Sequence, residues 1–253
     1  MDDVPRGKEH FVLVHGAGHG AWCWFKLVCL IKGSGHRVTC IDLAGAAGTF
    51  VDPTTSGRSM IMTRRSSTSW RPCRTERSAG GLSVTHVMHM FRHIIKQAIF
   101  IAATMLPFGY LTEQDVKDGV PDLSEFGDVY DLKFGLGEDH PPTSVALRKE
   151  HQRTILYQQS PQEDSTLASI LLRPWPAALS TARFGCIHDG IESTVNTVRR
   201  VHLKTANDHM VKPEQQEAMI HRWPPSEVMV MDTDHSPFFS APEHLLELIL
   251  KSL

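Results

Sequence analysis

The stretch from His10 to Trp24 reads HFVLVHGAGHGAWCW and decides the fold. Its first half is an apolar, β-branched run of the kind that forms a buried parallel strand. A glycine-rich turn follows, and Ala21 to Lys32 then has helical apolar spacing that ends at Gly33. Arg37 to Leu43 (RVTCIDL) reads as a second strand. Strand, turn, helix and strand form a βαβ unit, which predicts a mostly parallel sheet with a right-handed crossover.

The alternation continues along the chain. Helices are expected over Leu82–Phe91, Pro213–Trp223 and Pro242–Leu253, and strands over Gln97–Ala103, Val198–Thr205 and Val228–Met231. Between about residues 110 and 184 the pattern loosens, with several prolines and short helices. An insertion of this size usually covers the active site of an α/β sheet protein. We therefore expect residues 1–253 to form one α/β domain with a cap segment at about 110–184.

Composition excludes several classes of function. The chain has 253 residues, 41% of them hydrophobic and 21% charged, with a net charge of −2. This balance favours neither nucleic acid nor a membrane surface as a partner. The five cysteines are scattered, without the spacing of a zinc site or a disulfide framework, so buried thiols in a cytosolic protein are expected. No metal or organic cofactor is implied, and a homodimer stays open.

Two short motifs suggest nucleophilic chemistry. In the HG turn (His15–Gly20), glycines let the backbone turn tightly, so that the N–H of Ala17 could point at an oxyanion. A plain turn or a phosphate loop is the alternative, but Ala21 stands where a G-x-G-x-x-G motif needs its last glycine. Farther on, Ser78 and Ala79 precede two glycines and an apolar helix, as in a nucleophile elbow, although an ordinary helix cap explains the same residues.

An acid and a base follow later strands. Asp208 comes after the strand that ends at Thr205, and His235 after the strand that ends near Met231. The order Ser, Asp, His is that of α/β-hydrolase triads, and strand ends are where such sheets place their sites. Asp208 would then fix the tautomer of His235, which would take the proton from Ser78.

The residues HFVLVHGAGHGAWCWFK, IDLAGAAGT, SAGGLSV, AIFIAATMLP and DTDHSPFFSAPE together resemble the plant methylesterase and hydroxynitrile lyase family of α/β-hydrolases. The resemblance covers nearly the whole chain. It implies hydrolysis of small methyl esters of hormone acids such as indole-acetate, jasmonate and salicylate. It also implies Ser78, Asp208 and His235 as the triad, with Ala17 and Ala79 as oxyanion donors. Lyases of the family carry a lysine after the catalytic histidine, and Ser236 stands there, which favours the esterase branch.

The segment Gly57–Arg77 departs from the family pattern. It holds six arginines and one acidic residue, and Glu76 and Arg77 replace the glycine and histidine expected before the serine. Such a polar stretch cannot serve as a central parallel strand at low cost. In a shifted reading frame the segment can encode an amphipathic helix. The codons of Met60 and Met62 both end in G, and in the shifted frame this G begins an aspartate codon. We hypothesise a frameshift or misplaced splice junction that also removed one central strand.

Three readings follow from these residues. The first is an esterase whose elbow at Ser78 is altered. The second is an α/β-hydrolase relative that binds a small ligand without turnover. The third is the inactive product of a frameshifted gene model.

Overall fold

A computed structural model describes residues 8–43, 59–64, 70–75, 80–183 and 195–253, with only the backbone described for 59–64 and 70–75. The predicted βαβ unit is confirmed. β1 (His10–Val14) runs parallel to β2 (Arg37–Ile41), with His10 opposite Arg37. The connection between them is the 3-10 turn η1 (Ala21–Trp24) followed by helix α1 (Phe25–Gly33).

A second parallel ladder is built from later segments. β5 (Gln97–Ile101) pairs with β9 (Arg199–Thr205), which pairs with β10 (Glu227–Met231). The helices around this ladder are α2 (Gly80–Phe91), α7 (Pro213–Arg222), the short α8 (Pro237–Ser240) and α9 (Pro242–Lys251); the turn η2 (Arg92–Ile94) leads from α2 to β5. The expected strands and helices are thus confirmed to within a few residues.

The two parallel ladders are not joined by any described strand. The described ladders are β1–β2, β10–β9–β5, and two others, so β1 and β5 each have a second edge with no described neighbour. β3 (Ser59–Arg64) and β4 (Trp70–Thr75) form an antiparallel pair of their own. The polar segment before Ser78 therefore contains a strand, but that strand is not part of either parallel ladder.

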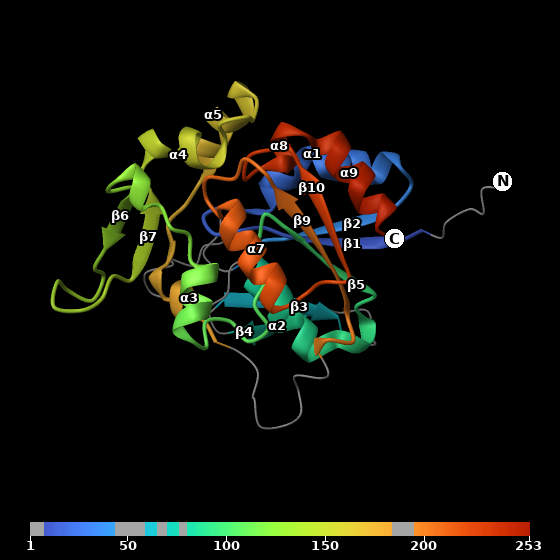
Figure 1. The fold of residues 1–253 in the computed structure, drawn as a ribbon, viewed down its shortest axis with the longest axis horizontal. Helices are drawn as coiled ribbons and strands as arrows, with labels where there is room; N and C mark the ends of the chain where they lie inside the picture. The colour runs from blue at the N-terminus through green and yellow to red at the C-terminus, as the bar shows by residue number, and fades with distance from the viewer. Residues whose placement is uncertain (1–7, 44–58, 65–69, 76–79, 184–194) are drawn as a thin grey trace.

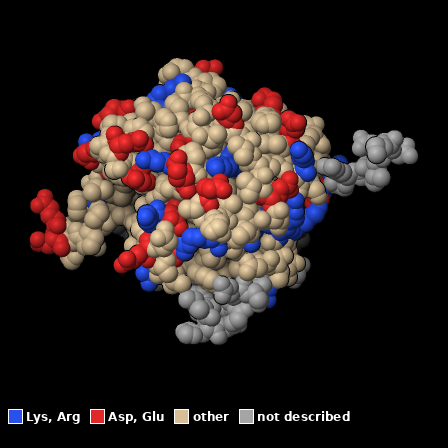
Figure 2. All heavy atoms as spheres, viewed as in Figure 1, with Lys and Arg blue, Asp and Glu red and all other residues tan. Residues whose placement is uncertain are grey.

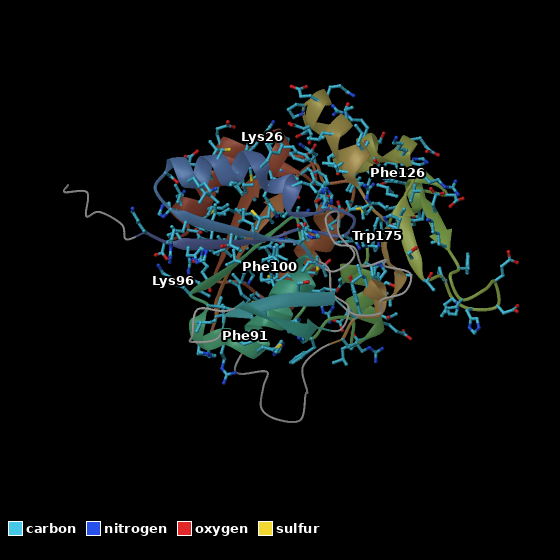
Figure 3. The ribbon with its side chains drawn as sticks, turned by 180° about the vertical axis from the view of Figure 1, so that it is seen from behind. Lys26, Phe91, Lys96, Phe100, Phe126 and Trp175 are labelled. Atoms are coloured by element: carbon cyan, nitrogen blue, oxygen red, sulfur yellow. The ribbon has the colours of Figure 1, made fainter. Side chains whose placement is uncertain are left out.

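The cap segment contains short helices, as expected, and a small antiparallel sheet that the sequence did not reveal. Its elements are α3 (Glu113–Gly119), η3 (Ser124–Phe126), β6 (Tyr130–Lys133), β7 (Ser144–Leu147), α4 (Lys149–Leu156), α5 (Gln162–Leu171), β8 (Trp175–Pro176) and η4 (Ala177–Thr181). β6, β7, α4 and α5 lie together at one side of the molecule (Figure 1). Lys26 of α1 forms an ion pair with Asp164 of α5, which ties the cap segment to the βαβ unit (Figure 3).

Helices α1 and α9 pack against each other beside β1 and β2 (Figure 1). Leu27 and Ile31 of α1 and Leu245 and Ile249 of α9 are each 3% exposed or less. The four-residue spacing within each pair places both side chains on one helix face, which buries a continuous apolar stripe. On another side, Phe100 of β5 packs with Met88 of α2 (Figure 3). The cysteine prediction is only partly right, since Cys23 is buried but Cys29 is exposed.

Candidate active site

Asp208 and His235 come together as predicted. His235 Nδ1 lies 2.9 Å from Asp208 Oδ2 and 3.1 Å from Oδ1. The carboxylate of Asp208 is buried and also accepts hydrogen bonds from the hydroxyl of Thr205 and from the backbone N–H groups of Met210 and Val211. Because β9 and β10 are parallel neighbours, the turns that follow them meet at the same sheet edge.

The carboxylate also fixes the proton on the imidazole. An ionised carboxylate only accepts hydrogen bonds, so Nδ1 of His235 carries the hydrogen and Nε2 has a free lone pair in the neutral ring. Burial lowers the pKa of His235. The charge of Asp208, its hydrogen bond and, to a smaller extent, the charge of Asp234 raise the pKa by more, so the pKa of His235 lies above its usual value. His235 is thus a base with its reactive nitrogen free and its charged form stabilised.

The HG turn is held by its own histidines. His15 Nδ1 lies 2.8 Å from the carbonyl of Gly16, and its Nε2 accepts the backbone N–H of Leu43 at 3.0 Å. His19 Nδ1 lies 3.1 Å from the carbonyl of Ala17. Within the described residues no acceptor lies opposite the N–H of Ala17. In the described part of the chain, the predicted oxyanion donor is therefore not engaged in the turn's own hydrogen bonds.

Ser78 and Ala79 lie outside the described residues, which resume at Gly80 as the first residue of α2. Gly80 has a φ of +31°, and a Cβ there would lie 3.2 Å from the Cα of Gly16. A Cβ at Gly81 would lie 2.1 Å from the carbonyl oxygen of Thr104. Glycine is needed at both positions because the start of α2 is in close contact with the HG turn on one side and with the chain after β5 on the other.

The sequence did not identify Asp234 or Tyr157 as site residues. Asp234 is fully buried and accepts hydrogen bonds from the backbone N–H groups of Gln159 and Ser236 and from the hydroxyls of Ser160 and Ser240. It thereby joins the loop of His235 to the cap segment. Tyr157 donates its hydroxyl to His19 at 2.7 Å. The position of Asp234 next to His235 was the only available signal for its link to the cap segment, because Gln159 and Ser160 lie some 75 residues away.

A cavity of about 1550 Å³ opens between these groups, with Ala17, His235 and Trp175 in its wall. It also extends along both parallel ladders, since every residue from Lys8 to Val14 and from Gln97 to Thr104 lines it. Successive strand residues face opposite sides of a sheet, so an unbroken run of lining residues means that the strand edge borders the cavity. The volume exceeds that of a usual small-ligand pocket because it combines a substrate pocket with the space between the ladders.

Among the described residues no group of three or more His, Cys, Asp and Glu side chains is placed to hold a metal ion. No helix in the described ranges is long and apolar enough to cross a membrane. Acidic and basic side chains are interspersed over the face shown in Figure 2.

A carboxylate–imidazole pair at the ends of parallel strands, a glycine turn whose Ala17 N–H has no acceptor among the described residues, and a cap segment define an α/β-hydrolase. Comparison with known proteins specifies the family, although no protein-family model matches. The chain is 45% identical over 255 residues to Methylesterase 17 of Arabidopsis thaliana, covering 98% of this chain and 92% of that protein. It is 35% identical to Methyl jasmonate esterase 1 of Vitis vinifera, with 94% of each covered. The crystal structure of the Arabidopsis methylesterase MES16 matches with a TM-score of 0.74 and 33% identity, over 96% of this chain and 98% of that one. The chain belongs to the plant methylesterases, which are carboxylesterases of the α/β-hydrolase fold.

Proposed function

We propose that this protein hydrolyses small methyl esters of plant hormone acids, of the indole-acetate, jasmonate or salicylate type. The observation that carries the proposal is that His235, hydrogen-bonded to Asp208, lines the same cavity as Ala17, whose N–H has no acceptor among the described residues. Methyl jasmonate is the substrate named for the grapevine relative. Ser236 follows His235, in the place where the lyases resembling this chain have a lysine, and this favours hydrolysis over cyanohydrin cleavage.

Ser78 is the proposed nucleophile. It lies two residues before Gly80, and two residues of extended chain reach at most about 7 Å. A Cβ at Gly80 would lie 3.2 Å from the Cα of Gly16, so the described start of α2 borders the HG turn, and this supports a nucleophile just before Gly80 in the sequence. His235 Nε2 takes the proton from Ser78 as its oxygen attacks the ester carbonyl, and the N–H groups of Ala17 and Ala79 stabilise the oxyanion. Collapse breaks the bond to methoxide, which takes the proton from His235 and leaves as methanol. Water, deprotonated by His235, then releases the acid and restores Ser78.

The test compares the native chain with Ser78→Ala on p-nitrophenyl acetate and on the methyl esters of the three hormone acids. We expect turnover by the native chain, and loss of at least about a thousandfold in the variant, because the nucleophile is removed. Equal turnover by both proteins would contradict the proposal. The same assay on the three esters ranks the acid moieties.

A second candidate is ligand binding without turnover. It is favoured by the size of the cavity and by the altered residues Glu76 and Arg77 before the serine. Methyl jasmonate bound by a folded protein, measured by calorimetry without release of methanol, would support it. Absence of both binding and turnover would instead support the inactive product of a frameshifted gene. We propose the cytosol as the compartment, to be tested with a fluorescent fusion in leaf cells.

A further inference from the structure

The three successive carbonyls of the HG turn all accept hydrogen bonds. The Gly16 oxygen is bonded by His15 Nδ1 at 2.8 Å and by the backbone N–H of His19 at 3.3 Å. The Ala17 oxygen is bonded by His19 Nδ1 at 3.1 Å, and the Gly18 oxygen by the backbone N–H of Arg173 at 2.9 Å. A turn in which three successive carbonyls are engaged cannot rotate those peptide planes freely.

These bonds set the direction of the proposed oxyanion donor. The N–H of Ala17 belongs to the same planar, trans peptide group as the carbonyl of Gly16, so the two point in opposite directions. Fixing the Gly16 oxygen therefore aims the Ala17 N–H away from His15. The next peptide plane is fixed through the Ala17 oxygen by His19. The two peptide planes that flank the Ala17 Cα are thus each held by a histidine ring.

Each ring is anchored at its other nitrogen. A carbonyl only accepts, so both histidines must carry their hydrogen on Nδ1, and Nε2 must accept. Leu43, which follows β2, donates its N–H to His15 at 3.0 Å, and Tyr157 of the cap segment donates its hydroxyl to His19 at 2.7 Å. One ring is therefore attached to the sheet and the other to the cap segment.

We propose that His15 and His19 are positioning residues, a brace of two neutral Nδ1–H imidazoles that aims the Ala17 N–H, with Tyr157 linking this brace to the cap segment. The environment keeps both rings neutral. Burial lowers the pKa of His19 to about 3, and burial also lowers the pKa of His15, partly offset by its bond to Gly16 and by Asp42. Protonation of His15 would turn Nε2 into a donor facing the backbone N–H of Leu43, which cannot accept, so charge and geometry exclude each other at this ring. At His19, burial opposes the charge.

The tautomers can be measured without any activity. In protein labelled with ¹⁵N-histidine, long-range ¹H–¹⁵N correlation spectra distinguish Nδ1–H, Nε2–H and charged rings, with His15→Gln and His19→Gln used for assignment. We expect both rings to remain neutral Nδ1–H tautomers from pH 5.5 to 8. An Nε2–H tautomer or a titration of either ring in this range would overturn the brace.

The catalytic consequence rests on the proposed function and is tested with Tyr157→Phe, which removes one hydroxyl. We expect the Nε2 signal of His19 to shift while His15 is unchanged, and kcat to fall by about tenfold at constant KM, because a loosened donor stabilises the transition state less. Tyr110→Phe is the control for loss of a buried hydroxyl elsewhere in the cavity wall, since Tyr110 donates its hydroxyl to the carbonyl of Gly119 at 3.1 Å and not to the HG turn. Unchanged kcat in an active protein would refute the role of Tyr157. An inactive native chain with the predicted tautomers would instead refute the esterase proposal and leave the brace standing.

Discussion

We predict that one strand added in the space between β1 and β5 stabilises the protein. Both strands have five residues, and both run along one cavity with no described strand between them. Val12 of β1 is 45% exposed, although it lies in the middle of an apolar strand. The perturbation is insertion of Val-Ile-Leu-Val-Gly between Arg77 and Ser78. A strand of this length extends about 17 Å, which matches its two neighbours.

The expected gain follows from burial. Four large apolar side chains buried in this space contribute roughly 6–12 kcal/mol, and hydrogen bonds to the two strand edges add a few kcal/mol more. Ordering the inserted residues costs about 7 kcal/mol. We expect a net gain on the order of 3 kcal/mol, which for a chain of this size raises Tm by roughly 6–12 °C.

The assay is thermal unfolding followed by circular dichroism, with two controls. A Gly-Ser-Gly-Ser-Gly insert at the same place has the same length without apolar side chains. The apolar insert placed between the exposed residues Gly137 and Glu138 separates a local effect from a general one. Equal Tm values for the apolar and the Gly-Ser insert at Arg77 would refute the reasoning. If the strand also orders the elbow, esterase turnover should rise in the apolar insert alone.

Three further outcomes are expected. Asp208→Asn should lower kcat by about 10⁴-fold on an ester substrate, because the amide no longer holds His235 in the Nδ1–H form; retention of more than a tenth of the rate would contradict a triad. The acidic limb of kcat/KM should lie above pH 6.5, since Asp208 helps to raise the pKa of His235 and the base must be neutral, and Asp208→Asn should move this limb to lower pH. Gly81→Ala should cost about 3 kcal/mol of unfolding free energy in urea titrations, because its Cβ would meet the Thr104 carbonyl at 2.1 Å. Gly33→Ala is the control, with open space around the new methyl group and an expected gain of up to about 1 kcal/mol.

Much of this architecture was predictable because its signals are local. The strand at His10–Val14, the glycine turn and the apolar stripe of α9 depend on neighbouring residues, and so does the position of Asp208 and His235 after their strands. The small sheet of β6, β7 and β8 was missed because its strands are only two to four residues long, and because β8 pairs with β7 across about 30 residues. The partners of Asp234 and His19 were missed for a related reason, since a hydrogen bond across 75 or 138 residues leaves no trace in a local pattern.

The candidate site can keep its geometry although the segment before Ser78 departs from the family pattern, because its described residues are held by other parts of the fold. The HG turn is held by the β1–β2 unit through Leu43, and Asp208 and His235 are held by the β9–β10 pair. The two parts are connected by hydrogen bonds to the cap segment, from Tyr157 to His19 and from Gln159 and Ser160 to Asp234, and by the ring contact of His19 with Phe238. None of these bonds involves the segment before Gly80. A change confined to that segment is therefore expected to act on the proposed nucleophile Ser78 and on the space between the ladders, while Asp208, His235 and the N–H of Ala17 keep their geometry. Binding of an ester should accordingly survive changes in residues 57–77 that abolish its hydrolysis.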